Sequence, residues 1–276
     1  MAPVSSFSGF PFFSPGPVGP PTLVPAGFFD RDGQQVALDL LGKVLAHRVK
    51  GLWLAARIIE TEAYYLEDKA SHASLGRTPK RRAMFMPPGT IYMYFSRGGD
   101  SFNLSVAGEG NAVLVKSGVP WLGSLEDGLP LADGPAQARL ALMSRLNPPG
   151  RRHPARHTLF PEPASPSPRR PEARPPQKLC SGQTLLCRAL GLQVARWDGN
   201  HLPQPDLGLW DTGSRPSQVV RTPRLGISPR RDPHLPYRFV DGDYAPFCTR
   251  NPFRGLPFGQ EPILISPRAD GGWDLP

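Results

Sequence analysis

The chain has 276 residues, of which 39% are hydrophobic and 36 are proline, and its formal net charge is +9. This length suffices for one large domain or two small ones, and the surplus of proline indicates disordered segments beside the folded part. The positive charge favours an acidic partner, nucleic acid or an anionic membrane surface, although surplus arginine can also serve only solubility.

The cysteines and the N-terminal residues indicate in which compartment the protein functions. The chain has an odd number of cysteines, and their spacing is not that of a disulfide framework or a zinc site: Cys180, Cys187 and Cys248. The first 25 residues contain no charged side chain, unlike a secretory signal, and no apolar run is long enough to cross a bilayer. We therefore expect a soluble protein with reduced thiols and no membrane partner, located in the cytoplasm and associated with the nucleoid if bacterial.

The predicted elements begin after residues 1–25, which are rich in Pro, Gly and Ser and predict a disordered tail. Segment 32–49 predicts an amphipathic helix, because five apolar residues recur at helical spacing: Ala37, Leu38, Leu41, Val44 and Leu45. Four β-prone segments follow, separated by Pro/Gly turns: 52–64, 90–95, 101–106 and 111–117. They indicate a mainly antiparallel sheet connected by hairpins.

The second half of the chain opens with a basic stretch. Residues 148–177 are rich in Pro and Arg and predict an insertion loop. Segment 180–192 predicts a short helix with Ser181 as its N-cap and Gly191 near its C-terminal end. Three β-prone pieces follow: 223–228, 236–240 and 262–266. The two halves are typical of one sheet system, so we expect a single domain from 26 to 265 and a C-terminal tail, 266–276.

Segment 58–72 concentrates carboxylates beside aromatic residues in an otherwise basic chain. On an extended strand alternate residues share one face, so Glu60, Glu62 and Tyr64 are expected to point the same way. A carboxylate beside an aromatic ring can hold a water next to a stacked planar group. A lone pattern of this kind is, however, more often the solvated face of an edge strand.

Aromatic and basic residues nearby strengthen the catalytic interpretation. Tyr92 and Tyr94 repeat the same-face aromatic spacing, and His72 closely follows the acidic segment. Four basic side chains between them are candidates for phosphate contacts: Arg77, Lys80, Arg81 and Arg82. Aromatic rings, a carboxylate and a basic rim are the parts needed to extract a base from DNA and cleave its glycosidic bond.

Two other functions are compatible with these residues. A metal-dependent nuclease could use Glu60, Glu62 and Asp68, if a further ligand converges from the segment after Tyr65. A nucleic-acid-binding module without catalysis would use its tyrosines only to stack on bases, and it would not require Glu62.

Several motifs occur in a fixed order along the chain. "FFDRDGQQVALDLLGKVL" and "RIIETEAY" are followed by His72, "MFMPPGTIYMY" and "NLS", and then by "LCSGQTLLCRALGL", "RLGIS" and "PYRFV". In this order they resemble the alkyladenine (3-methyladenine) DNA glycosylases of the non-helix-hairpin-helix type, from about Phe28 to Val240 outside the insertion. The resemblance implies an α+β fold, a single mixed domain with a curved, mainly antiparallel β-sheet and flanking helices, without a metal or other cofactor.

The resemblance also implies roles for matching residues. Glu62 matches the general base that activates the water attacking C1′ of the sugar. Lys116 stands where the family commonly has an Arg assisting this water, and Lys cannot reproduce the bidentate geometry of Arg. Arg97 occupies the position at which the relatives usually place a Tyr that wedges into the DNA.

The base-binding pocket of the family is matched by four residues. Tyr64 and Tyr94 correspond to the rings that sandwich the extruded base, and His72 lies against its edge. Asn103 corresponds to the residue that excludes guanine by crowding its 2-amino group.

The chemistry of the substrate agrees with these roles. Methylation at N3 or N7 gives a purine a positive charge, so the base leaves easily and binds aromatic faces by cation–π interaction, worth about 0.5 to 2 kcal/mol. The enzyme then needs a positioned water and a carboxylate, but no lysine nucleophile. We therefore predict a monofunctional DNA-3-methyladenine glycosylase that starts base excision repair. It is expected to act as a monomer on double-stranded DNA containing alkylated or deaminated purines.

Overall fold

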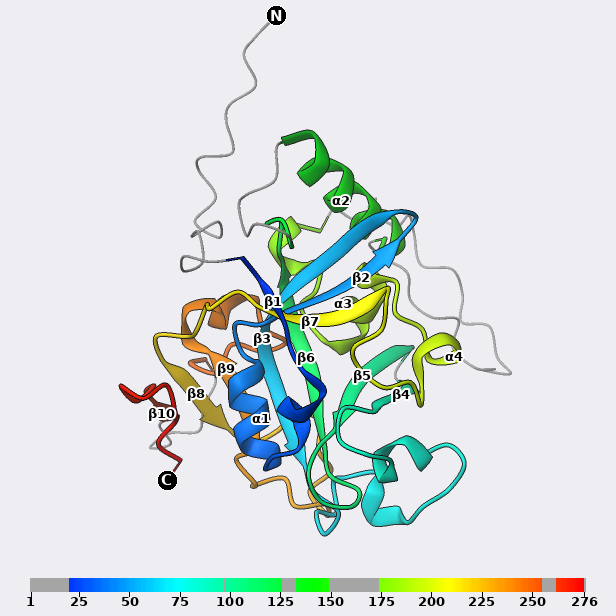
Figure 1. Ribbon diagram of the computed structural model, residues 1–276. Coiled ribbons are helices and arrows are strands. Elements are labelled where there is room, and N and C mark those ends of the chain that lie inside the picture. Colours follow the sequence, from blue (N-terminus) through cyan, green and yellow to red (C-terminus); the bar gives the residue numbers. More distant parts are fainter. Residues whose placement is uncertain (1–19, 97, 126–132, 149–173, 255–261, 276) are drawn as a thin grey trace, which may run out of the picture.

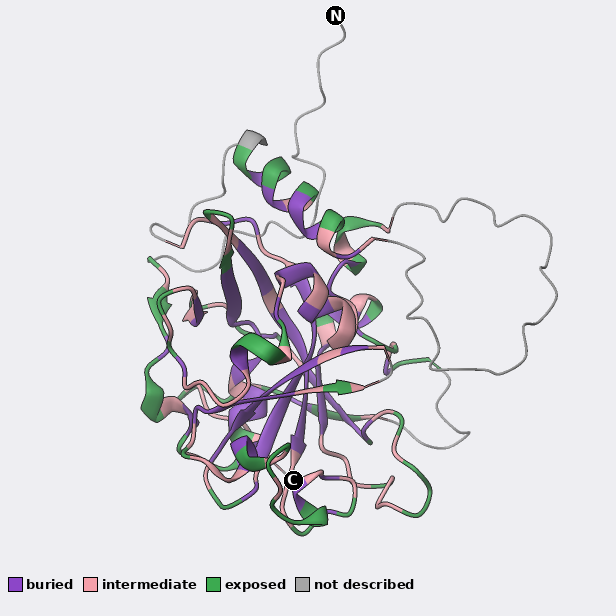
Figure 2. Cartoon of the chain, turned by 90° about the vertical axis from the view of Figure 1, so that its right-hand side faces the viewer, coloured by how far each residue is buried: buried purple, intermediate pink, exposed green. Residues whose placement is uncertain are grey.

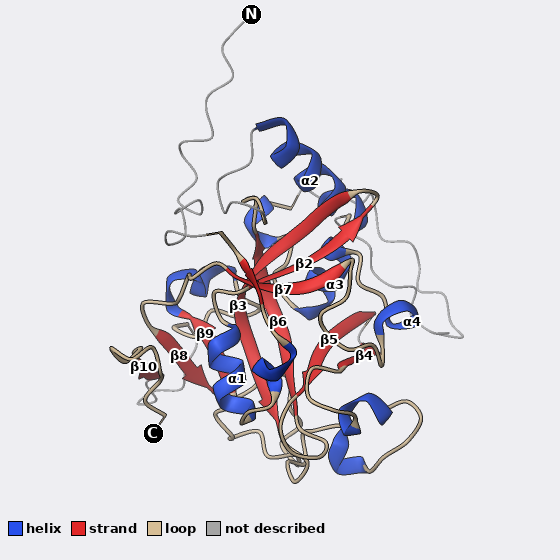
Figure 3. Ribbon diagram, viewed as in Figure 1, coloured by secondary structure: helices blue, strands red, loops and turns tan. Residues whose placement is uncertain are grey.

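A sheet of ten strands forms the centre of the protein (Figure 1). The computed structural model describes residues 20–96, 98–125, 133–148, 174–254 and 262–275. Within these ranges every strand pair is antiparallel, and the helices pack around the sheet (Figure 3). The predicted α+β class with a mainly antiparallel sheet is thus confirmed.

The described elements have the following bounds. The strands are β1 (Thr22–Leu23), β2 (Val44–Val49), β3 (Leu52–Tyr64), β4 (Ile91–Ser96), β5 (Gly99–Ser105), β6 (Ala112–Pro120), β7 (Leu207–Asp211), β8 (Val219–Thr222), β9 (Arg238–Asp241) and β10 (Ile263–Ile265). The α-helices are α1 (Gly33–Leu40), α2 (Asp133–Leu146), α3 (Gln183–Leu190) and α4 (Val194–Trp197). Short 3-10 helices cover 26–29, 73–75, 82–85, 176–178 and 242–247.

Strand β3 is the longest strand and organises the sheet. One edge pairs with β6, and the other edge pairs first with β2, up to Arg57, and then with β9, from Glu60 to Glu62. The main path runs β1-β7-β2-β3-β6-β5-β4, and β9, β8 and β10 form a branch from β3. The sheet therefore branches where β9 joins β3, at Glu60 and Glu62. Figure 1 shows β8, β9 and β10 together beside β3.

The two sides of β3 meet different surroundings. Thr61 and Ala63 face α1, because the Thr61 hydroxyl donates to the carbonyl oxygen of Ala37 at 2.8 Å and Ala63 belongs to the main hydrophobic core. Alternate residues of a strand point to opposite faces, so Glu62 and Tyr64 lie on the side away from α1. Figure 2 shows that the central strands are mostly buried, whereas exposed residues gather on the loops and on outer helix surfaces.

Segment 32–49 does not form a single helix, and this prediction is wrong. Helix α1 starts at the cap Asp32, ends at Leu40, and is followed by β2 from Val44. Gly42, between the two, has a φ of 85°, and a Cβ there would overlap the carbonyl oxygen of Ser214. The glycine permits the turn that ends the helix, and the apolar residues after it alternate in a strand.

The other predicted elements agree with the structure to different degrees. β3, β4, β5 and β6 confirm the four strands of the first half, and β9 and β10 overlap two of the pieces near the C-terminus. Segment 223–228 is a loop, whereas the neighbouring β8, β7 and the helix α2 were not predicted. At α3 the N-cap is Gly182 rather than the predicted Ser181, because the Ser181 hydroxyl donates to the carbonyl oxygen of Cys248 at 3.0 Å. Gly191 ends the helix in the left-handed region, as expected.

The chain ends differ in part from the expected tails. Thr22 and Leu23 pair with β7, so the last residues of the predicted N-terminal tail are ordered. In the predicted C-terminal tail, the Trp273 indole donates to Asp39 of α1 at 2.8 Å. Residues 1–19 and most of the basic insertion, 149–173, lie outside the described residues.

Two expectations drawn from composition can be compared with the structure. The three cysteines are buried and free, in agreement with the expected reduced thiols. Among the helices of the described ranges, none combines the length and apolar character needed to cross a membrane.

A buried ion pair holds the branch point of the sheet together. Arg238 Nε of β9 donates to Glu60 Oε1 of β3 at 2.7 Å, and both side chains are almost fully buried. The Ser117 hydroxyl and the Thr249 backbone N–H donate to Glu60 Oε2. Burial alone would raise the pKa of Glu60, but the charges of Arg238 and Lys116 together with the hydrogen bonds from Ser117 and Thr249 lower the pKa below its ordinary value. The carboxylate is therefore charged and fully satisfied.

Replacing Arg238 by Met should strongly destabilise the fold. The variant leaves the Glu60 carboxylate buried without its cation, which typically costs about 3 to 5 kcal/mol. The free energy of unfolding in urea measures this loss. Arg268→Met is a matched control, because Arg268 pairs with Asp270 on the surface, with half or more of each side chain exposed. Equal effects of the two substitutions would contradict a structural role for the buried pair.

A second buried carboxylate makes stability depend on pH. Asp241 is fully buried at the end of β9, and burial raises its pKa to about 6 although Arg57 lies 3.4 Å away. Because the folded state then binds the proton more tightly than the unfolded chain, this group destabilises the fold above pH 6, and the penalty is relieved as the pH falls.

Asp241→Asn should remove this dependence. Between pH 7.5 and pH 5, wild type should gain about 1 kcal/mol of unfolding free energy relative to the variant. Urea denaturation of both proteins at the two pH values checks the sign, since all other titrating groups cancel in the difference. A relative loss of wild-type stability on acidification would show that the ion pair with Arg57 dominates instead.

Candidate active site

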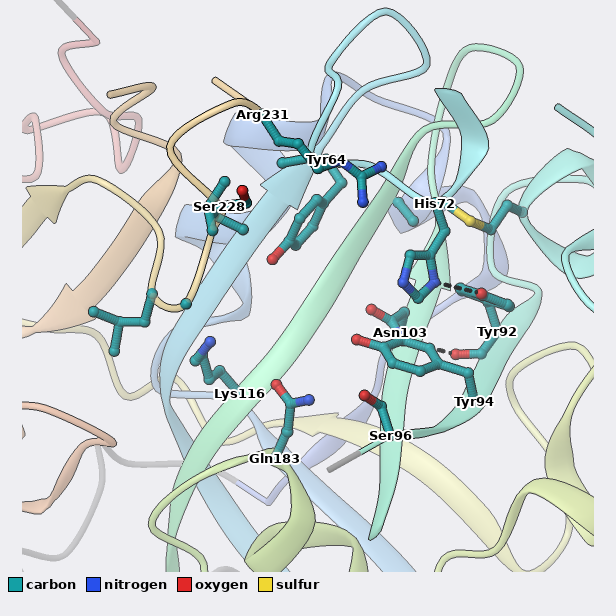
Figure 4. Close-up of a pocket in the computed structure, with 16 residues that line it drawn as sticks. Tyr64, His72, Tyr92, Tyr94, Ser96, Asn103, Lys116, Gln183, Ser228 and Arg231 are labelled. Atoms are coloured by element: carbon teal, nitrogen blue, oxygen red, sulfur yellow. Dashed lines mark hydrogen bonds between the residues drawn. The ribbon is translucent and has the colours of Figure 1, made fainter. Parts of the chain in front are cut away.

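A cavity of about 330 Å³ opens on the side of β3 that carries Glu62 and Tyr64 (Figure 4). Strands β3, β4, β5 and β6 form its floor, and its walls come from the segment after β3, the start of α3 and the loop after β8. The lining residues are Tyr64, Ala70, His72, Met84, Tyr92, Tyr94, Ser96, Asn103, Ala112, Lys116, Gln183, Leu225, Gly226, Ile227, Ser228 and Arg231.

The register of the sheet explains why distant residues meet on this floor. Tyr92 of β4 pairs with Asn103 of β5, Asn103 pairs with Leu114 of β6, and Leu114 pairs with Glu62 of β3. Directly opposite residues of antiparallel strands place their side chains on the same face. One row across four strands therefore carries the predicted base, Glu62, and one residue of the predicted pocket, Asn103, with Tyr92 at its end.

Glu62 is fully buried, accepts two hydrogen bonds and forms an ion pair with Lys116. The Tyr64 hydroxyl donates to Oε2 at 2.7 Å, whereas Lys116 Nζ and the backbone N–H of Leu225 reach Oε1 at 2.9 and 3.1 Å. A carboxylate has about four lone-pair positions, so it can accept one further O–H group. Glu62 does not itself line the cavity, and its partners Tyr64, Lys116 and Leu225 separate it from the open space.

Lys116 owes its position to a β-bulge. Glu60 pairs with Ser117 and the next residue, Thr61, pairs with Val115, so Lys116 is an extra residue in β6. A bulge bends the strand and re-aims the side chain of the extra residue. The Lys116 side chain is 8% exposed, and its ammonium group forms an ion pair with Glu62. Figure 4 shows this side chain at the edge of the cavity.

Tyr64 is fixed from two directions. Its hydroxyl is bound to Glu62, and the Arg224 guanidinium lies 4.5 Å from the centre of its ring. Arg224 is in turn paired with Asp68 and donates to the carbonyl oxygen of Ala63. Burial, followed by the charge of Glu62, raises the pKa of Tyr64 well above its ordinary value, so the phenol is neutral and donates its proton.

His72, Tyr92 and Tyr94 form the opposite wall. The His72 and Tyr94 rings lie 4.5 Å apart in an edge-to-face arrangement, and His72 Nδ1 is 2.8 Å from the Tyr92 hydroxyl. Burial lowers the pKa of His72, and the charges of Arg231 and Arg81 lower it further. The imidazole is therefore neutral at pH 7.

The predicted pocket residues surround one space. Figure 4 shows Tyr64 on one side of the cavity and His72 with Tyr94 on the other, with Asn103 on the floor between them. Asn103 is 4% exposed, and its Nδ2 donates to the carbonyl oxygen of Tyr92 at 3.0 Å, which fixes the amide. The sandwiching of a base, the contact of His72 with its edge and the exclusion of guanine stay predictions.

The three carboxylates of the nuclease alternative do not converge. Glu60 is bound to Arg238, Asp68 to Arg224 and Glu62 to Lys116, and neither Glu60 nor Asp68 lines the cavity. Among the described residues, no group of three or more His, Cys, Asp or Glu side chains lies together in a manner that could hold a metal ion. One cation for each carboxylate does not fit a divalent metal site.

The predicted phosphate contacts differ in exposure. Three of them are exposed on the segment between His72 and β4: Arg77, Lys80 and Arg82. The fourth, Arg81, is half-buried and donates to the carbonyl oxygen of Gly76 at 2.7 Å. The three exposed side chains can contact a phosphate backbone. Arg81 also stabilises the loop that carries His72. Arg97 lies outside the described residues, so its wedge role stays a prediction.

Sequence reasoning missed several cavity residues. Gln183, at the first position of α3, lies within a quoted motif, and its Nε2 donates to the Ser101 hydroxyl at 2.8 Å. Ser228 ends the quoted motif "RLGIS" but was assigned no role, and Arg231 lies in the loop after it, where no sequence pattern marked it. The contact from the Leu225 backbone N–H to Glu62 does not depend on residue type and could not be read from a motif.

The family model described as Methylpurine-DNA glycosylase (MPG) matches residues 27–144 and 159–245. The chain belongs to the methylpurine-DNA glycosylase family. The matched regions contain the four floor strands, both tyrosine-bearing walls and the loop that contacts Glu62.

Relatives from bacteria and archaea extend this match. The chain is 52% identical to proteins of Pseudomonas aeruginosa (strain UCBPP-PA14) and Pseudomonas fluorescens (strain Pf0-1), over 84% and 86% of its length and 85% and 91% of theirs. It is 31% identical to a protein of Methanocella arvoryzae over 83% of its own length and 98% of the relative. All three are provisionally named 3-methyladenine DNA glycosylases.

Proposed function

We propose that this protein releases alkylated or deaminated purines from double-stranded DNA by hydrolysing the N-glycosidic bond with a water activated by Glu62. One observation carries the proposal: a fully buried carboxylate lies directly behind an aromatic-walled cavity, in a chain of the methylpurine-DNA glycosylase family. The reaction would start base excision repair, in the compartment that holds the DNA.

The cavity suits a planar base taken out of the duplex. Its volume of about 330 Å³ lies at the lower end of the range of small-molecule sites. Tyr64 can stack on one face of the base, and Tyr94 with His72 on the other. Since such an enclosed space cannot be reached by a base still stacked in DNA, the nucleotide must flip out of the helix.

The charges of the walls favour a cationic base. Aromatic faces attract a methylated, positively charged purine. His72 is neutral because burial lowers its pKa, so this wall does not repel the cation. The negative charge nearest to the reacting sugar is that of Glu62.

Hydrolysis follows from the hydrogen bonds of Glu62. A water that donates to this carboxylate loses its proton to it while the oxygen attacks C1′ of the deoxyribose. The electrons of the glycosidic bond pass to the departing base and neutralise its positive charge. Tyr64 and Lys116 hold the carboxylate in place during this step, which needs no lysine nucleophile and no cofactor. The sequence-based expectation of a monofunctional enzyme rests on this point.

Glu62→Gln should abolish base release and spare binding. The amide keeps the shape but cannot accept the proton of the water, and the loss of a general base typically lowers rates by about 10²- to 10⁴-fold. Release of free base from methylated duplex DNA in EDTA measures turnover, and a gel-shift titration measures affinity for the same DNA. Glu67→Gln, on an exposed neighbouring carboxylate, is the matched control.

Three outcomes of this experiment separate the candidate functions. Turnover by Glu62→Gln close to wild type would contradict the role of Glu62 as the base. Binding of lesion DNA by wild type without any base release would favour the nucleic-acid-binding module. Strand cleavage that EDTA abolishes would favour the metal-dependent nuclease.

Two substitutions at Tyr64 should separate its hydroxyl from its ring. Tyr64→Phe removes the hydrogen bond to Glu62 and should slow base release by roughly 10- to 100-fold, since bonds to charged groups are worth about 1.5 to 3 kcal/mol. Tyr64→Ala should also weaken binding of lesion DNA relative to undamaged DNA by about 1 to 3 kcal/mol. The control is Tyr65→Phe, whose hydroxyl bonds to Asp32 outside the cavity. Equal effects of Phe and Ala on binding would mean that the ring does not stack on the base.

A further inference from the structure

Lys116 is the one primary amine among the described residues that line the cavity. Its side chain is 8% exposed, and its Nζ lies 2.9 Å from Glu62 Oε1. If Glu62 activates the water that attacks C1′, an amine at hydrogen-bond distance from this carboxylate is close to the same carbon. The cavity that releases a base therefore holds the resulting abasic sugar beside a lysine.

An amine next to a carboxylate is a pair with known reactivity toward aldehydes. Lysine forms Schiff bases with carbonyl groups, provided that a neighbouring base can take its proton. Arginine cannot replace it, because the guanidinium stays protonated and is not a nucleophile. Lys116 thus offers a reaction that an Arg at this position would not.

We infer that Lys116 gives the protein a second activity, cleavage of the DNA strand at the abasic site through a Schiff base. This inference rests on the proposed function, because the abasic sugar is the product of base release. It makes the enzyme bifunctional, in contrast to the monofunctional activity expected from the sequence.

The reaction starts from the ring-opened form of the abasic sugar, in which C1′ is an aldehyde. Lys116 gives a proton to Glu62 and its nitrogen attacks C1′; Glu62 returns this proton as water leaves, so the C=N bond forms as a protonated imine. The protonated imine acidifies the hydrogen on C2′. When this proton moves to a base such as the Glu62 carboxylate or water, the electrons of the C2′–H bond form a C2′=C3′ double bond. The C3′–O bond breaks, and its electron pair leaves on the phosphate.

Water then hydrolyses the imine and frees the amine of Lys116. The products are one strand end with an unsaturated aldehyde and one with a 5′-phosphate. The sequence of steps consumes no oxidant, reductant or further co-reactant. Its requirements are an amine shielded from solvent and a carboxylate that exchanges protons with it, both of which the Lys116–Glu62 pair supplies.

The test uses full-length protein and duplex DNA with a pre-formed abasic site, made by excising uracil. Borohydride reduces the imine to a stable covalent protein–DNA adduct, and a denaturing gel measures adduct and strand cleavage. Lys116→Arg keeps the positive charge and removes the nucleophile, so it should lower both signals by at least about 10-fold. Lys69→Arg, an exposed lysine beside the cavity rim, should match wild type and excludes trapping by surface amines.

Mass mapping of the adduct from wild type provides a readout that does not depend on a variant folding. The DNA remnant should be attached to the peptide that contains Lys116. Attachment elsewhere, equal trapping by wild type and Lys116→Arg, or the absence of an adduct from wild type would overturn the inference. Failure of the proposed function is visible separately: it would be the absence of base release from methylated DNA by wild type, a step that the pre-formed abasic site bypasses.

Discussion

Three buried carboxylates in and just after β3 are each paired with a cation from β6 or from a later segment, and these pairs determine how those segments attach to β3. Glu60 binds Arg238 of β9, Glu62 binds Lys116 of β6, and Asp68 binds Arg224 of the loop after β8. Removing one partner of such a pair leaves an uncompensated charge in the interior and costs several kcal/mol. Alternative arrangements of the branch and of the loop after β8 are disfavoured because each of them would leave such a charge unpaired.

The three pairs have similar chemistry but different surroundings. The pairs of Glu60 and Asp68 stabilise the fold, whereas the pair of Glu62 lies beside the cavity. Glu60 is saturated by Arg238, Ser117 and Thr249, away from the cavity. Asp68 orients Arg224, whose guanidinium lies against the ring of Tyr64 and fixes the position of that ring. The pair of Glu62 and Lys116 is the one that meets the cavity, because the bulge in β6 turns the lysine toward it.

The sequence predicted the strands of the floor well, since alternation of buried and cavity-facing residues is a local property of each strand. The same logic failed for segment 32–49, because apolar residues at helical spacing continued beyond Gly42 into a strand. Strand alternation placed Glu60 on the same face as Glu62, but it could not reveal that Arg238 of β9, directly opposite Glu62, binds Glu60 away from the cavity. Bulges and backbone contacts depend on pairing across the sheet, and no periodicity in one segment reveals them.

The bulge at Lys116 also bears on the expectation, drawn from the resemblance, that an arginine would stand at this position. A guanidinium could bind Glu62 through two parallel N–H groups, but the carboxylate already accepts hydrogen bonds from Tyr64 and the Leu225 backbone. A single ammonium contact to Oε1 leaves an acceptor position on the carboxylate for water, whereas a bidentate contact would compete for it. A lysine here therefore lacks the bidentate geometry of arginine, and one acceptor position on the buried carboxylate remains for the proposed water. In the proposed reactions the lysine also places a solvent-shielded amine beside the sugar, so the cation that holds Glu62 during hydrolysis would be the nucleophile of the inferred strand cleavage.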